Sequence, residues 1–140
     1  MQFWAALVAA LPLWGLLWWL RPPAHPWLQL QANLWPAMMI VTVYPVLEEI
    51  VFRGALQGFL LRTIRCRLPG PVSTANLLTS IMFTVLHGLR WLTGWSLLVM
   101  FPSLVFGYFR ERTGGLIASI LLHAFYNAGL YLIISPAVGA

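Results

Sequence analysis

The chain alternates long apolar stretches with short segments rich in proline, glycine and arginine. The apolar runs occupy residues 1–20, 35–61, 74–91, 95–109 and 116–134. Since a helix needs about 20 mainly apolar residues to cross the hydrocarbon core of a bilayer, most of these runs approach the required length. The pattern predicts an all-α fold: a polytopic transmembrane helix bundle of about five spans.

Proline residues punctuate this pattern. Pro45 lies inside the second run and predicts a bend or break in that helix, and a proline-rich connector covers residues 22–33. The first run also fits a secretory signal, but no basic segment precedes it and no clear small-residue cleavage site follows. We therefore expect residues 1–20 to be retained as the first span.

Composition reinforces the membrane interpretation. Of the 140 residues, 61% are hydrophobic and only 8% are charged, with a mean hydropathy of +0.84. A soluble domain carries about 25% charged residues. We expect a single integral membrane domain over residues 1–140, with the lipid bilayer as its surroundings and no room for a nucleic-acid-binding module. The lone Cys66 cannot form an internal disulfide.

The formal net charge of +5 comes from arginine alone, because lysine is absent. Arginine is densest after the second and fourth apolar runs, at Arg62, Arg65, Arg67, Arg110 and Arg112. Loops rich in positive charge stay in the cytoplasm. The distribution predicts a cytoplasmic N-terminus and an external C-terminus.

Two of the three acidic residues, Glu48 and Glu49, stand side by side inside the second apolar run. Carboxylates at membrane depth are expensive and usually serve function. Glu49 and Arg53 are four residues apart, so they share a helix face and can pair, which leaves open a purely structural role for them. Glu48 is rotated by about 100° from Glu49. A glutamate in a low-dielectric setting suits a general base or acid near neutral pH.

Two further polar pairs occur on later runs. His87 follows Phe83 by four residues, and Asn127 follows His123 by four. Each pair alone is typical of helix packing, where polar side chains bond neighbouring helices. Together with the two glutamates, they place carboxylates, imidazoles and an amide on three helices, which indicates an active site. Gly107 and Gly129 are expected to permit close helix approach, and residues 73, 74 and 76 to cap the third helix.

The three motifs in order, Glu-Glu-x-x-x-Arg, Phe-x-x-x-His and His-x-x-x-Asn, resemble those of the CPBP intramembrane proteases (CAAX-processing and bacteriocin-processing, also called Abi). The resemblance covers a core of about residues 35–131 and extends to Pro45 and to the Glu111-Arg112-Thr113-Gly114 segment. The chain is shorter than many members, and its size is similar to compact bacterial members that process C-terminal sorting tails. The resemblance implies an endopeptidase of a bacterial inner membrane, acting on a membrane-associated protein or peptide without a cofactor.

The resemblance also implies a role for each matching position. The catalytic positions would be Glu48 and His87, which activate water, and His123 and Asn127, which stabilise the oxyanion of the tetrahedral intermediate. The supporting positions would be Glu49, Arg53 and Phe83. With a cytoplasmic N-terminus, these residues would lie between the membrane midplane and the outer leaflet.

Three alternatives remain open from the residues alone. Glutamate and histidine are also zinc ligands, so a zinc-dependent membrane metallopeptidase is the nearest rival, although Asn127 is a poor ligand and no His-x-x-x-His pair is present. A proton-coupled carrier would also bury such groups, but the chain shows no inverted repeat. A non-catalytic scaffold or immunity factor is the third. The sequence does not indicate the oligomeric state.

Overall fold

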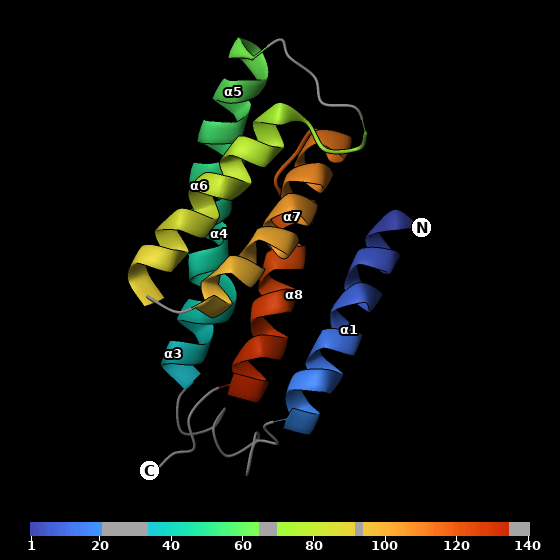
Figure 1. The fold of residues 1–140 in the computed structure, drawn as a ribbon, viewed down its shortest axis with the longest axis vertical. Coiled ribbons are helices and arrows are strands. Elements are labelled where there is room, and N and C mark those ends of the chain that lie inside the picture. The colour runs from blue at the N-terminus through green and yellow to red at the C-terminus, as the bar shows by residue number, and fades with distance from the viewer. Residues whose placement is uncertain (21–33, 65–69, 92–93, 135–140) are drawn as a thin grey trace. The chain divides into compact units, whose positions relative to one another are not determined.

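The computed structural model describes residues 1–20, 34–64, 70–91 and 94–134, and within these ranges it contains helices and no β-strand. In chain order the main helices are α1 (Gln2–Leu20), a composite helix over Leu34–Thr63, α6 (Thr74–Trp91), α7 (Met100–Thr113) and α8 (Ile117–Ile134) (Figure 1). A short 3-10 segment, η3 (Gly94–Val99), leads into α7. The all-α prediction is confirmed, and every apolar run forms a helix.

Two of these helices are long and apolar enough to cross a membrane by length and composition: Gln2–Trp19 and Leu34–Thr63. Thr74–Leu89 and Ile117–Ile133 are shorter apolar helices. The number of spans, about five, therefore stays a prediction. The predicted connector at residues 22–33, and the predictions for Cys66 and its neighbouring arginines, lie outside the described residues.

The composite helix changes register along its length. It consists of α3 (Leu34–Met38), the π-helical η1 (Met39–Val43), α4 (Tyr44–Glu49), the π-helical η2 (Ile50–Leu56) and α5 (Gln57–Thr63). The sequence predicts a bend or break at Pro45, but the helix continues through it. The π-helical turn just before Pro45 explains this, because hydrogen bonds there reach five residues instead of four and accommodate an interruption in the usual ladder.

The chain divides into two compact units. Unit 1 comprises Met1–Val46 and Leu121–Ala140, and unit 2 comprises Leu47–Ile120. The prediction of one membrane domain over residues 1–140 stays a prediction.

In unit 1, α1 packs against the C-terminal part of α8 (Figure 1). The Tyr126 hydroxyl donates to the Ala6 carbonyl at 2.9 Å, and the rings of Trp14 and Phe125 lie 4.7 Å apart. A Cβ on Gly129 would overlap the Trp14 ring. The close helix approach predicted at Gly129 is confirmed.

In unit 2, α6 begins at a side-chain cap and packs against α7. The Ser73 Oγ accepts a hydrogen bond from the Asn76 main-chain N–H at 3.0 Å, which confirms Ser73 as the cap. Asn76 instead reaches across to α7, where its amide donates to the Leu104 carbonyl at 2.9 Å. Its side chain fills the space beside Gly107, so the predicted close approach there is also confirmed.

The C-terminal end of α7 differs from the sequence prediction. Residues 110–112 were expected in a loop after the fourth span, but they form the last turns of the helix. The helix ends at Gly114, whose backbone takes a left-handed conformation (φ 69°) that suits glycine. Arg110 and Arg112 favour this extension, because cations are stabilised near a helix C-terminus.

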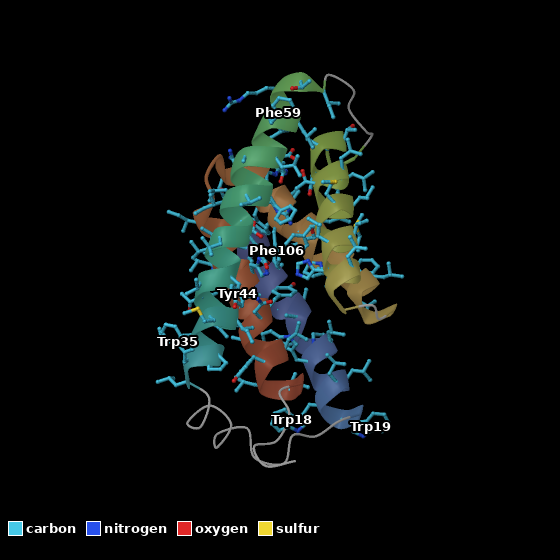
Figure 2. All side chains as sticks on the ribbon, turned by 90° about the vertical axis from the view of Figure 1, so that its left-hand side faces the viewer. Trp18, Trp19, Trp35, Tyr44, Phe59 and Phe106 are labelled. Carbon is cyan, nitrogen blue, oxygen red and sulfur yellow. The ribbon has the colours of Figure 1, made fainter. Side chains whose placement is uncertain are left out.

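Many large apolar side chains lie on the outside of the protein, whereas several polar side chains are buried inside unit 2. Trp19, Trp35 and Phe59 are 77%, 68% and 62% exposed, whereas Phe106 is 2% exposed inside unit 2 (Figure 2). The fully buried residues of unit 2 include Glu49, Arg53, Gln57, Asn76, Thr79, Ser80, Ser103 and Ser119. An exposed apolar surface of this extent is typical of an interaction surface, and it agrees with the membrane setting that the composition predicts.

We expect Gly107→Ala to destabilise the protein by about 1–3 kcal/mol, because the added methyl group would overlap Asn76, which is fixed by its bond to α7. Gly58→Ala is the matched control, since its Cβ would meet only the Arg53 carbonyl at 4.0 Å. Thermal unfolding in detergent measures both. A loss at Gly58 as large as that at Gly107 would contradict this packing.

Candidate active site

The predicted ion pair of the second helix is present and buried. Arg53 Nε lies 3.3 Å from Glu49 Oε2, and neither side chain is exposed to solvent. Arg53 also donates from Nη2 to both the carbonyl (3.0 Å) and the hydroxyl (2.8 Å) of Ser103 on α7. Arg53 therefore fixes the carboxylate of Glu49 and fastens its own helix to α7.

Glu48 lies in a different environment from its neighbour. It precedes Glu49 near the end of α4 and is half-buried, whereas Glu49 is fully buried. Arg53 interacts electrostatically with both carboxylates, more strongly with Glu49. The two adjacent glutamates are thus distinguished by their burial and by the strength of their interaction with the buried Arg53.

Phe83 connects the ion pair to His87. The Arg53 guanidinium lies over the Phe83 ring, 5.4 Å from its centroid, a cation–π arrangement. On the same ring, His87 packs with centroids 4.2 Å apart, and Phe52 packs edge-on at 4.9 Å. Phe83 is 1% exposed. The Phe-x-x-x-His spacing thus places the Phe83 ring one helical turn before His87, where it packs against the imidazole.

A hydrogen bond sets the orientation of the His87 ring. Its Nδ1 lies 2.9 Å from the Phe83 carbonyl oxygen. Because a carbonyl oxygen only accepts, Nδ1 carries the hydrogen, and in the neutral ring Nε2 keeps its lone pair. His87 therefore presents a proton-accepting nitrogen on the side away from its own helix backbone.

The contact between Phe52 and Phe83 relates Glu48 to His87. Glu48 lies one turn before Phe52 on the composite helix, and His87 lies one turn after Phe83 on α6. The two helices run in opposite directions in unit 2 (Figure 1). Along the helix axes, Glu48 and His87 consequently lie on the same side of the Phe52–Phe83 contact.

Sequence reasoning missed a second set of polar residues in unit 2, built around the fully buried Gln57. Gln57 donates from Nε2 to the Gly107 carbonyl (3.1 Å) and to Glu111 Oε1 (2.7 Å), and the Ser73 hydroxyl donates to the same Glu111 oxygen at 2.6 Å. A signal was available, because Gln57 repeats the four-residue spacing of Glu49 and Arg53. Glu111 follows the fourth apolar run in the sequence, and that position does not indicate its contribution to the helix interface.

His123 and Asn127 lie on α8 within unit 1. His123 is 4% exposed. The Asn127 amide Nδ2 donates to the Ile40 carbonyl of η1 at 3.0 Å. The structure thus brings Glu49, Arg53 and the Phe83–His87 pair together in unit 2, and it places the third predicted motif in unit 1.

A zinc site would need several ligands side by side. Among the residues that the structure describes, no three histidine, cysteine, aspartate or glutamate side chains are grouped in this way.

The sequence matches a protein family over residues 29–129, the family described as type II CAAX prenyl endopeptidase Rce1-like. This segment contains all three motifs and most of the chain. The protein is an intramembrane endopeptidase by class, and it belongs to this family. Membership confirms the resemblance inferred from the motifs and implies an integral membrane protein with a membrane-associated protein substrate. No curated protein and no solved structure matches the chain significantly.

Proposed function

We propose that the protein is a glutamate-dependent intramembrane endopeptidase that works without a cofactor. Glu48 acts as the general base that removes a proton from the attacking water, and His87 assists through Nε2. The water adds to the scissile carbonyl, and the proton is then returned to the leaving amine. Glu49 and Arg53 do not contact the substrate but hold the helix that carries Glu48.

One observation carries this assignment: the two adjacent glutamates are not equivalent. Glu49 is fully buried in an ion pair with Arg53, so it is committed to the helix interface. Glu48 is half-buried, one position earlier. A base must reach water and substrate, and of these two glutamates Glu48 is the one that is partly accessible.

His123 and Asn127 are our proposed donors to the oxyanion that forms when water adds to the carbonyl. Both side chains carry N–H groups, and donors fixed in advance where negative charge develops supply a large part of catalysis in hydrolases. The Asn127 amide has two hydrogens, so its bond to Ile40 leaves one for this purpose.

The substrate that we propose is a membrane-associated protein with a C-terminal sorting tail, cut near the outer boundary of a bacterial inner membrane. The direct test is co-expression with candidate membrane-tethered substrates, compared by intact mass between the wild type and Glu48→Ala. Arg62→Ala, an exposed substitution in α5, is the matched control. A mass change that persists with Glu48→Ala would reject the assignment.

A zinc peptidase is the second candidate, because glutamate and histidine also bind zinc. We expect cleavage by the purified protein to be unchanged after dialysis against a strong chelator and to need no added metal. Metal analysis of the same sample gives the control. Activity that disappears with the chelator and returns with zinc alone would favour the metal mechanism.

The proposed orientation places the N-terminus and the turn between α7 and α8 in the cytoplasm. A cysteine at Gly115, where the added side chain meets nothing within 4 Å, tests this in a Cys66→Ser background. We expect a membrane-impermeant thiol reagent to label it only after the cells are permeabilised. Labelling in intact spheroplasts would reverse the orientation.

A further inference from the structure

Pro45 removes one main-chain hydrogen-bond donor from the middle of the composite helix. Pro45 is the second residue of α4 and has no N–H group. In a regular α-helix the carbonyl deprived of a partner would be that of Val41, four residues earlier. The π-helical turn of η1 shifts the hydrogen bonds by one residue, so the deprived carbonyl changes too.

The register assigns the deprived carbonyl to Ile40. The Tyr44 N–H, which would serve Ile40 in an α-helix, bonds to Met39 instead. In the π-helical register the Ile40 carbonyl would accept from the main-chain nitrogen of residue 45, but the nitrogen of Pro45 carries no hydrogen. The Ile40 carbonyl is therefore left without a helical donor from either position, and a main-chain carbonyl without a partner is costly in the apolar surroundings of a membrane.

The Asn127 side chain supplies the hydrogen bond that the Ile40 carbonyl lacks from its own helix. Its Nδ2 donates to the Ile40 oxygen at 3.0 Å, and both residues belong to unit 1. We propose that Asn127 is a positioning residue that replaces the N–H missing at Pro45 and thereby holds the π-helical turn at the start of α4. Pro45 and Asn127 then form one functional pair, although 82 positions separate them in the sequence.

This role goes beyond the proposed oxyanion contact, because it uses the other amide hydrogen and acts on the helix backbone. It also explains why the chain tolerates a proline inside a helix that must cross apolar surroundings. The bonded turn comes just before α4, whose later residues include Glu48. A change in the hydrogen bonding of this π-helical turn would rotate or shift the residues that follow it.

A double-mutant cycle tests the pairing. We expect Asn127→Ala to lower the melting temperature in detergent, and we expect its effect in a Pro45→Ala background to be roughly half or less. Alanine restores a main-chain N–H, so Ile40 gains a donor from residue 45 in the π register or from Tyr44 in the α register. The same two-step measurement with Pro12, an exposed proline inside α1, is the control and should show no coupling.

The outcome is decisive in either direction. Equal losses from Asn127→Ala with and without Pro45 would overturn the proposal. If Asn127→Ala alone does not fold, recovery of a folded protein on adding Pro45→Ala supports it, and failure to recover rejects it. Cleavage by the double variant separates the two roles of Asn127. If stability is restored and cleavage is not, Asn127 both holds the helix and donates to the oxyanion. If stability and cleavage are both restored, Asn127 holds the helix but does not donate to the oxyanion.

Discussion

Replacing Glu48 by glutamine should abolish peptide-bond cleavage and leave the protein folded in the membrane. Glutamine keeps the size and hydrogen-bonding capacity of the side chain but cannot take a proton from water. General-base catalysis contributes about 10²–10⁴-fold to a rate, so turnover by the purified variant should fall by at least that order. Single-turnover cleavage of an identified substrate measures the loss.

Glu111→Gln is the matched control for this experiment, because it removes the one acidic residue outside the Glu48–Glu49 pair. A glutamine there can still accept from Gln57 and Ser73, so we expect cleavage to continue. His87→Ala should be about as severe as Glu48→Gln. Substantial turnover by purified Glu48→Gln would refute a glutamate mechanism.

Removing Arg53 should have the largest effect on stability. Arg53→Ala leaves the buried Glu49 carboxylate without its cation, removes two hydrogen bonds to Ser103 and takes the guanidinium off Phe83. Breaking a buried ion pair by deleting one partner costs about 3–5 kcal/mol. Thermal unfolding in detergent should show a much lower melting temperature for Arg53→Ala than for Glu48→Gln.

Arg62→Ala separates the loss of a buried charge from the loss of any arginine, since Arg62 is exposed in the last turn of α5. We expect its melting temperature to remain close to that of the wild type. If Arg53→Ala and Glu48→Gln melt at the same temperature, the division between a structural and a chemical glutamate is wrong.

The helices and the ion pair could be predicted because both depend on local spacing. Apolar runs near membrane length fold as helices wherever they are, and residues four apart share a helix face regardless of what surrounds them. Glu49 with Arg53, and Phe83 with His87, follow from this rule alone. The predicted catalytic roles of Glu48, His87, His123 and Asn127 stay predictions.

Partners on other helices could not be predicted in the same way. Gln57 is an ordinary polar residue until α7 brings the Gly107 carbonyl and Glu111 to it. The register change around Pro45 was missed because a proline signals a lost hydrogen bond but not how the chain compensates. The compensation depends on Asn127, which lies on a different helix.

The position of Arg53 relative to Glu49 also bears on how the protein is made. A lone charged side chain at the centre of an inserting helix costs about 2.5–3.5 kcal/mol during transfer from the translocon. Because these two residues are one turn apart on the same helix, they can neutralise each other as soon as that helix forms, before any later span has entered the lipid. The residues that later hold Arg53 in the finished bundle, such as Ser103, need not be synthesised yet. The helix that carries the two glutamates therefore brings its own counter-ion through biogenesis.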